Sequence, residues 1–287
     1  MREVTLRPAA PYLLRASTGP PDPCRRYRAG VLELVYRTTA GHARAWVWQR
    51  ADGTLGARIH AEQLDVAHDR LCELLHVRLD HRAFLTLAGR DPLLRPLRSR
   101  MAGYRPLLLS SPEHALVRAI SGQLIRSSDA YRIEFRLLAS LMPADDGFRL
   151  PPAASDLATA HPARFERAGL SPARAVTLSR AAGRLDWDAL GALDTPRLEA
   201  RLRSIRGLGA WSAGVVLMRG FGRLERGLAG DLALIKLCSA LSGRQADAED
   251  TARLLERYGP WAGLASSWLL GHPLAHTRGI SRLPKAG

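Results

Sequence analysis

Apolar and polar positions divide the chain into a short first part with strand periodicity and a longer second part with helical periodicity. In the first part, three segments are rich in β-branched and aromatic residues with partial period-two alternation, which is typical of half-buried strands: residues 31–37, 44–50 and 55–59. Gly41 and Asp52-Gly53 supply the turns of an antiparallel sheet. Trp46 and Trp48 are predicted to be core residues of this sheet rather than a platform for stacking bases.

From residue 64 the apolar residues recur at steps of three and four, which predicts a helix over 64–79 that covers the sheet. Ser111 and Pro112 are typical of an N-cap followed by the first helical position. Further helices are predicted over 128–142, 156–160, 171–182 and 194–203, with a loop over 143–152. No strand pattern returns after residue 61, so the pattern predicts an α+β protein with a small antiparallel β-sheet N-terminal domain and a large all-helical body.

The charge balance favours a polyanionic partner. Among the 287 residues, Lys and Arg number 42 and Asp and Glu number 27, which leaves a formal net charge of +15. Only Lys236 and Lys285 are lysines, and a compositional bias explains this preference for Arg over Lys. Such a bias does not explain the net excess, so we expect nucleic acid as the partner.

Cysteine and histidine spacing gives no sign of a metal site. Cys24, Cys72 and Cys238 are far apart, and none of the nine His residues lies in a metal-ligand motif. No uninterrupted apolar run approaches the ~18 residues of a membrane span, and the N-terminus has no signal-peptide pattern. We therefore expect a cytoplasmic protein, nucleoid-associated if prokaryotic, with no membrane partner and no metal.

Two helical patterns meet at Gly207-Leu208-Gly209. Apolar residues at helical spacing precede these three residues, and Trp211, Val215 and Met218 continue the spacing after them, which predicts a tight helical hairpin. Glycines permit a close backbone approach, so amides at the start of the second helix are able to bind a phosphate. The predicted DNA-backbone contacts are Gly207, Leu208, Gly209, Ala210 and Ser212. From these residues alone, a plain C-cap at Gly207 before a buried helix is the slightly favoured alternative.

The hairpin pattern becomes more specific when other stretches of the chain are considered with it. Four stretches resemble the helix-hairpin-helix DNA glycosylase superfamily, in its AlkA-like 3-methyladenine DNA glycosylase II branch: residues 122–124, 205–213, 230–234 and 259–268. The resemblance spans nearly the whole chain. We divide the chain accordingly into an N-terminal β-rich domain with its covering helix (1–89), a connector packing on the C-terminal helices (90–110), a helical domain ending in the hairpin (111–225) and a C-terminal helical domain (226–287).

The resemblance implies that Asp231 is the catalytic carboxylate. Cleavage of an N-glycosidic bond develops positive charge on the sugar, and a nearby carboxylate stabilises that charge and orients or deprotonates the attacking water. The local sequence also suits a helix N-cap at Asp231, and both roles are compatible. No metal or organic cofactor is needed for this chemistry, although a monovalent cation at the hairpin is compatible with it.

The resemblance also implies what the chain lacks. Relatives that cut the DNA strand carry a Schiff-base lysine two residues after the second glycine of the hairpin, where this chain has Trp211. Lys236 and Lys285 lie elsewhere in the sequence, so we expect a monofunctional enzyme. The three scattered cysteines exclude the iron–sulfur cluster of some relatives.

The remaining expectations concern the wedge and the base pocket. Leu124, with Gln123, matches the residue that fills the space left by a flipped base. Trp211 is the first candidate for a cation–π contact with an alkylated base, ahead of Trp268 and Trp261, which are also typical core residues. Val215 and Leu270 stand where a tyrosine and a tryptophan are typical, so the pocket is expected to be less aromatic.

The sequence thus predicts a monomeric, monofunctional glycosylase that flips and releases alkylated bases, of the 3-methyladenine or 7-methylguanine type, from double-stranded DNA. Two alternatives remain open. One is a glycosylase for deaminated or oxidised bases, and the other is a non-catalytic helix-hairpin-helix protein that only binds DNA.

Overall fold

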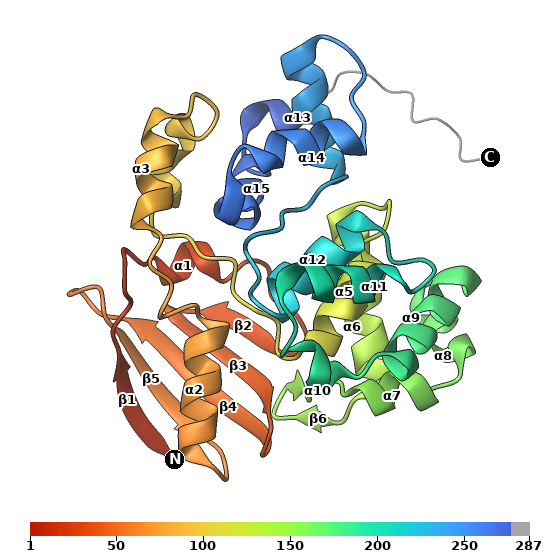
Figure 1. The fold of residues 1–287 in the computed structure, drawn as a ribbon. Helices are drawn as coiled ribbons and strands as arrows, with labels where there is room; N and C mark the ends of the chain where they lie inside the picture. Colours follow the sequence, from red (N-terminus) through yellow and green to blue (C-terminus); the bar gives the residue numbers. More distant parts are fainter. Residues whose placement is uncertain (277–287) are drawn as a thin grey trace.

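The computed structural model describes residues 1–276, so Lys285 lies outside the described residues. Its N-terminal part is an antiparallel five-stranded sheet in the order β1-β5-β4-β3-β2 (Figure 1). The strands are β1 (Arg2–Leu6), β2 (Arg25–Arg28), β3 (Val31–Thr38), β4 (Gly41–Gln49) and β5 (Leu55–His60). The three predicted strands are confirmed as β3, β4 and β5. The two outer strands, β1 and β2, extend the predicted sheet at both edges.

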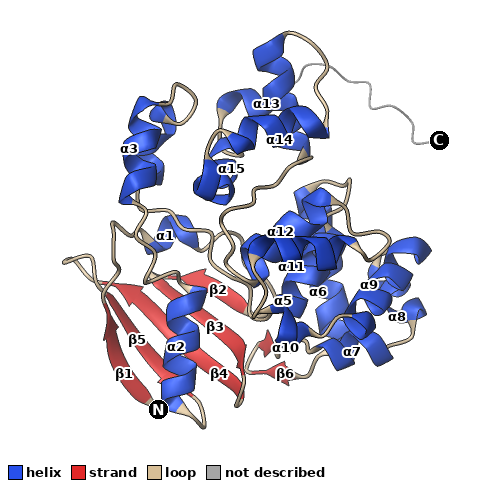
Figure 2. Ribbon diagram, viewed as in Figure 1, coloured by secondary structure: helices blue, strands red, loops and turns tan. Residues whose placement is uncertain are grey.

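Helix α2 (Leu64–Leu74) covers one face of the sheet, as predicted (Figure 2), but it ends earlier than residue 79. His76, in the left-handed region at φ 50°, takes the chain out of the helix. Alternate strand residues such as Leu34 and Val47 are buried beneath α2. The hydroxyl of Tyr36 fastens the sheet to the helix by donating to the carbonyl of Ala67 at 2.9 Å.

The core prediction for Trp46 and Trp48 is wrong. Both residues lie on the other face of the sheet, and both are partly exposed. Trp48 pairs with Gly56 across the strands, and its indole lies so close over this glycine that a Cβ there would be 2.3 Å from the ring. The strand alternation was correctly predicted, but it does not tell which of the two faces receives a helix.

A short helical connector follows the sheet and contains α3 (Arg82–Arg90), η1 (Arg95–Leu97) and α4 (Arg98–Met101). Phe84 of α3 packs edge to face on Trp268 of the C-terminal helices, with ring centroids 4.9 Å apart. Arg100 donates to the carbonyl of Gly271 at 2.7 Å. On the other side, Arg82 donates to the carbonyl of Ala9, so the segment lies against both the sheet unit and the C-terminal helices.

The rest of the described chain is helical, apart from one small hairpin. Its elements are α5 (Pro112–Ser121), α6 (Ser127–Leu141), β6 (Ala144–Asp145), β7 (Phe148–Arg149), α7 (Ala154–Thr159), α8 (Pro162–Ala168), α9 (Pro172–Arg184), α10 (Trp187–Leu190), α11 (Thr195–Arg203), α12 (Ala210–Gly220), α13 (Leu232–Ser242), α14 (Ala248–Glu256), η2 (Gly259–Trp261), α15 (Ala262–Leu269) and η3 (Pro273–His276); a further short helix, α1 (Leu14–Ser17), precedes β2. The prediction that no strand returns after residue 61 is wrong at β6 and β7. Each of these strands has only two residues, too few for a detectable period.

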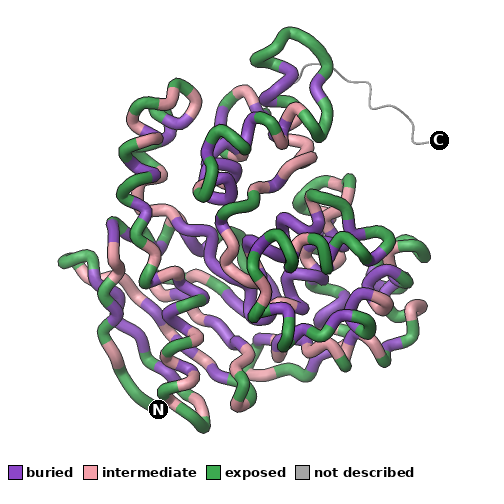
Figure 3. Tube along the Cα trace, in the orientation of Figure 1, coloured by how far each residue is buried: buried purple, intermediate pink, exposed green. Residues whose placement is uncertain are grey.

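Two apolar cores organise the molecule. One lies between the sheet and α2, and the other runs through the helical part, where α5 and α12 are buried along most of their length (Figure 3). Ser111 caps α5 as predicted, because its hydroxyl accepts the amide of His114 at 3.1 Å. No helix within residues 1–276 has the length and apolar character required to span a membrane.

Candidate functional site

The hairpin forms where the sequence predicts it. Helix α12 begins at Ala210, as expected, whereas α11 ends at Arg203, four residues before Gly207. Gly207 adopts φ +98°, and a Cβ at this position would lie 2.6 Å from the hydroxyl of Thr177. The tight packing of α9 against the hairpin therefore requires a glycine here.

Gly209 differs from Gly207 because no contact with the other described residues requires it to be a glycine. Its φ is −81°, and a Cβ built on it meets no atom within 4 Å. Gly209 is the N-cap of α12 and has no side-chain cap, so the first amides of this helix have no partner within the helix. The bare backbone is thus exposed at the positive end of a helix dipole.

Two of the predicted backbone contacts are buried. Leu208 is 3% exposed, and Ser212 is 3% exposed with its hydroxyl accepting from Gln123 at 2.9 Å. These values include the main chain, so a phosphate contact at Leu208 or Ser212 remains a prediction. Gly207, Gly209 and Ala210 are exposed, as a phosphate contact requires.

Asp231 is held in place from both sides. Gly230, at φ +82°, turns the chain, and its amide donates to the hydroxyl of buried Thr251 at 2.7 Å. Asp231 then caps α13, because its Oδ1 accepts the amide of Ala233 at 2.8 Å. Its other oxygen, Oδ2, accepts the indole N–H of Trp211 at 3.0 Å. The side chain is therefore both an N-cap and a carboxylate bound to the first turn of α12.

Trp211 lies between the hairpin and two turns from elsewhere in the chain. Its ring approaches Gly122 so closely that a Cβ at residue 122 would be 2.8 Å from the indole. Its own Cβ lies 3.9 Å from the position of a Cβ at Gly230. The partly exposed indole therefore contacts the end of α5 with its ring while its N–H binds the carboxylate.

The loop from Gly122 to Arg126 presents Leu124 to solvent. Leu124 is 79% exposed and adopts φ 52°, a conformation that is uncommon for a residue with a side chain. Gln123, predicted to belong to the wedge, instead turns its side chain into the protein and donates to the carbonyl of Gly207 at 2.8 Å. Of the two predicted wedge residues, only Leu124 is exposed, and its insertion into DNA stays a prediction.

Of the other predicted pocket residues, two are buried and two are, like Trp211, partly exposed. Val215 is 6% exposed, and Trp268 has no exposed surface, because it is packed on Phe84 as a core residue would be. Leu270 and Trp261 are partly buried against the same core. In this arrangement Trp268 has no face available for a base, and a role in the pocket remains a prediction for Trp211, Val215 and Leu270.

Sequence reasoning missed three residues that support the site. Thr251 fixes the turn before Asp231, and Arg174 of α9 donates to the main-chain carbonyl of Gln123. Ser267 of α15 faces α12, where its hydroxyl lies 3.6 Å from the sulfur of Met218. Each acts through a contact between distant segments, which no local sequence pattern signals.

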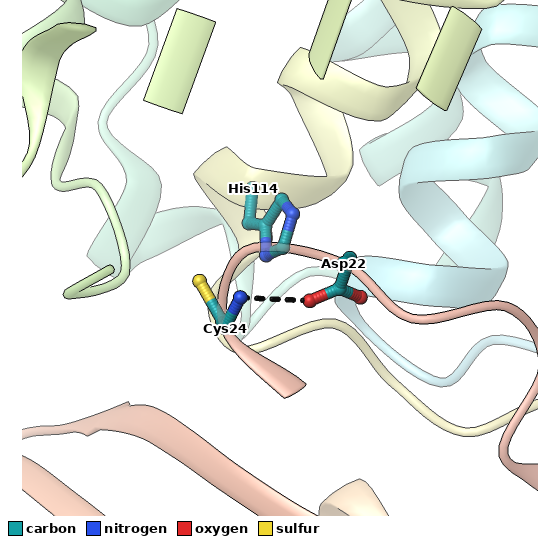
Figure 4. Close-up of side chains that lie close together, drawn as sticks. All are labelled: Asp22, Cys24 and His114. Atoms are coloured by element: carbon teal, nitrogen blue, oxygen red, sulfur yellow. Dashed lines mark hydrogen bonds between the residues drawn. The ribbon is translucent and has the colours of Figure 1, made fainter. Parts of the chain in front are cut away.

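A second polar cluster joins the loop before β2 to α5. Asp22, Cys24 and His114 have potential ligand atoms within 4.8 Å of one another, and all three are buried (Figure 4). A cation does not fit this cluster, because Asp22 already pairs with Arg25 at 2.8 Å and Arg118 at 3.3 Å. Burial, together with the charge of Asp22, raises the pKa of the Cys24 thiol, so the sulfur stays protonated.

Comparison of the sequence with known proteins finds a relative that matches most of the chain. No protein-family model matches the chain. It is 29% identical over 222 residues to the probable bifunctional transcriptional activator/DNA repair enzyme AlkA of Mycobacterium tuberculosis, a match that covers 74% of this chain and 44% of that protein. The chain therefore spans less than half the length of this relative.

Two solved structures extend the comparison over nearly the whole chain. A 3-methyladenine DNA-glycosylase from Archaeoglobus fulgidus superposes with a TM-score of 0.80 at 20% identity, covering 94% of this chain and 97% of that one. An 8-oxoguanine glycosylase/lyase from Clostridium acetobutylicum gives 0.75 at 16% identity, covering 95% and 96%. The resemblance to the helix-hairpin-helix DNA glycosylases, AlkA-like, is confirmed in fold, and the α+β fold class is confirmed with it.

Proposed function

We propose that this chain, an AlkA-like protein with the helix-hairpin-helix DNA glycosylase fold, releases alkylated bases from duplex DNA as a monomer. The bases we propose are of the 3-methyladenine or 7-methylguanine type, and the product is an abasic site. The matched relatives are named for DNA repair and for 3-methyladenine or 8-oxoguanine excision, which supports a glycosylase but leaves the lesion open.

The observation that carries this proposal is the position of Asp231. A helix N-cap needs only one carboxylate oxygen, and Oδ1 fulfils that need by accepting from Ala233. The other oxygen is held by Trp211, directly beside the exposed start of α12 and the loop that presents Leu124. A carboxylate, a DNA-gripping helix end and an exposed wedge leucine thus meet at one place.

The chemistry follows from these positions. A water oxygen bonds to the anomeric carbon of the deoxyribose while the bond from that carbon to the base nitrogen breaks, and the bonding electrons leave with the base. For a cationic alkylated purine these electrons cancel the positive charge, so no acid is needed at the base. The Asp231 carboxylate stabilises the positive charge on the sugar and receives or directs the proton lost by water.

We further propose that the enzyme does not cut the strand. The indole of Trp211 occupies the start of α12 where the resemblance places a lyase lysine, and an indole N–H is not a nucleophile. Lys236, the only lysine among the described residues, is exposed on α13. Borohydride should therefore trap no covalent complex between the protein and an abasic duplex.

The test uses a duplex with one alkylated base, incubated with the protein and then heated in alkali to break the strand at abasic sites. We expect breaks with the wild type only after alkali, and none with Asp231→Asn. Asparagine is as good an N-cap as aspartate, so this variant removes the charge and keeps the helix start. Base release at the wild-type rate by Asp231→Asn would remove Asp231 from the mechanism.

A panel of duplexes identifies the lesion. Release of hypoxanthine, uracil or 8-oxoguanine but no alkylated base would replace the proposed substrate and keep the reaction. Binding to damaged duplexes without release of any base would favour a DNA-binding protein without catalysis.

A further inference from the structure

The loop between α5 and α6 is fastened to the hairpin by a glutamine. The Nε2 group of Gln123 donates to the carbonyl of Gly207 at 2.8 Å and to the hydroxyl of Ser212 at 2.9 Å. These acceptors lie on the two sides of the hairpin turn, one before α12 and one inside its first turn. A single side-chain amide therefore connects the wedge loop with both parts of the hairpin.

The main chain of the same residue is held from a third element. Arg174, in the first turn of α9, donates to the carbonyl of Gln123. Gly122, the preceding residue, packs under the ring of Trp211. The two residues that lead into Leu124 are thus both held by other elements.

Leu124 itself has no such support from the other described residues. It is 79% exposed, and its backbone is in the left-handed region, which a leucine rarely adopts. An exposed apolar residue keeps such a backbone conformation only when neighbouring residues hold the chain in place. The contacts next to Leu124 in the chain are those of Gln123.

We propose that Gln123 is a positioning residue, which couples the DNA grip of the hairpin to the insertion of Leu124. This inference rests on the proposed function. When the amides at the start of α12 hold a phosphate, the amide of Gln123 fixes the distance from that phosphate to the leucine. Gln123 acts through Leu124 and does not contact the reacting atoms.

The coupling predicts a dependence on the stability of the base pair. Leu124 is needed to fill the gap left by a flipped base, and flipping costs least when the base is mismatched. Gln123→Glu keeps the size of the side chain, but its carboxylate does not donate to the Gly207 carbonyl. We expect Gln123→Glu and Gln123→Ala to slow single-turnover base release about tenfold in a well-paired duplex, as the loss of one or two hydrogen bonds would, and far less in a mismatched one.

A double-mutant cycle with Leu124→Ala separates positioning from general damage. If Gln123 acts through the wedge, Gln123→Ala has no further effect once Leu124 is alanine. The melting temperature of each variant is measured in parallel. An equal loss in both duplexes, or a full additional loss in the Leu124→Ala background, would overturn the proposal and leave Gln123 a structural residue.

A second measurement does not need base release. In the Asp231→Asn background, the fluorescence of 2-aminopurine in the duplex reports unstacking by the bound protein. We expect the 2-aminopurine fluorescence to rise when a protein with Gln123 binds the duplex. The rise should be smaller with Gln123→Ala, as it should be with Leu124→Ala. If unstacking depends on Gln123 but the wild type releases no base, the proposed function is refuted and the positioning role stands. If the bound protein causes no unstacking at all, the positioning role is refuted.

Discussion

The two glycines of the hairpin are required for different reasons. At Gly207 the protein itself demands a glycine, because of the positive φ and the hydroxyl of Thr177. At Gly209 the protein makes no such demand, since the φ is ordinary and the space beside the Cα is open. A partner backbone that approaches the start of α12 would occupy that space.

Alanine at each glycine should therefore give opposite results. Gly207→Ala is expected to lower the free energy of unfolding by more than about 1 kcal/mol, because a Cβ at positive φ is strained and clashes with Thr177. Gly209→Ala should cost at most about 1 kcal/mol, the scale of an N-cap change, but should weaken DNA binding at least as strongly as Gly207→Ala. Urea unfolding and fluorescence anisotropy with a duplex measure the two effects. Wild-type affinity in Gly209→Ala would show that no backbone approaches there.

At this scale the sequence identifies residues that have a local signature. Asp231 follows a glycine and precedes an apolar helix, and the N-cap predicted from this pattern is confirmed. The catalytic role of Asp231 and the wedge role of Leu124 rest on the family resemblance and stay predictions. Thr251 and Ser267 were not predicted, because a threonine or serine inside a helix has no pattern that reveals a partner on another helix. Trp268 has the same residue type as Trp211, and only its burial distinguishes it.

Helices α5 and α6 are joined by charges as well as by apolar packing. Glu134 of α6 is fully buried and accepts from His114 at 2.7 Å and from Arg118, both on α5. Arg118 also reaches Asp22, in the loop before β2. The network therefore holds together the two helices that the wedge loop connects.

Removal of Glu134 should consequently be costly. Glu134→Ala leaves the guanidinium of Arg118, only 12% exposed, without its main partner, and a broken buried pair costs about 3–5 kcal/mol. Asp129→Ala, on the same helix, is the control. Asp129 pairs with the exposed Arg132, and such surface pairs contribute at most about 1 kcal/mol. Equal losses of unfolding free energy in the two variants would show that the buried network adds nothing.

Elements with a clear period were predicted, and those without one were not. The apolar spacing gave α2, α6 and the hairpin helices, with errors of a few residues at their ends. Strand β2 was missed because three of its four residues are arginine, so it shows no alternation of apolar and polar residues. It forms at the edge of the sheet, where Arg26 and Arg28 are exposed and the buried Arg25 pairs with Asp22.

The whole molecule depends on the same network, because Asp22 belongs to the sheet unit while Arg118 and Glu134 belong to the helical part. Burial acts to raise the pKa of Glu134, but the charge of Arg118 and the hydrogen bonds from His114 and Arg118 outweigh it and lower the pKa. A carboxyl whose pKa is depressed by folding stabilises the protein above its unfolded pKa of about 4.3. This contribution is lost as the pH falls below that value.

The acid stability of the protein should therefore depend on residue 134. Between about pH 6 and about pH 3, the unfolding free energy of the wild type should fall more steeply than that of Glu134→Gln, which has no charge to lose. Urea unfolding across this range measures both slopes. Parallel slopes would mean that Glu134 titrates alike in the folded and unfolded chains, contrary to its lowered pKa.

At the largest scale, the net charge of +15 predicts how DNA affinity responds to salt. Each phosphate contact adds about 0.9 to the slope of log affinity against log salt concentration. Arg206 is exposed in the hairpin, and it forms no hydrogen bond or ion pair with the other described residues. Arg253, on α14, is instead paired with Glu249 and Asp250 at 3.0 and 2.6 Å.

We expect Arg206→Ala to reduce the salt slope by about one, as the loss of one phosphate contact should, and Arg253→Ala to leave it unchanged. Both variants lose one positive charge, so the comparison separates a local contact at the hairpin from the overall field of the protein. Anisotropy titrations of an undamaged duplex over a range of salt concentrations give the slopes. A similar decrease of the salt slope in both variants would assign the affinity to the net charge of the protein. Arg206, beside the exposed amides of α12, would then make no phosphate contact of its own.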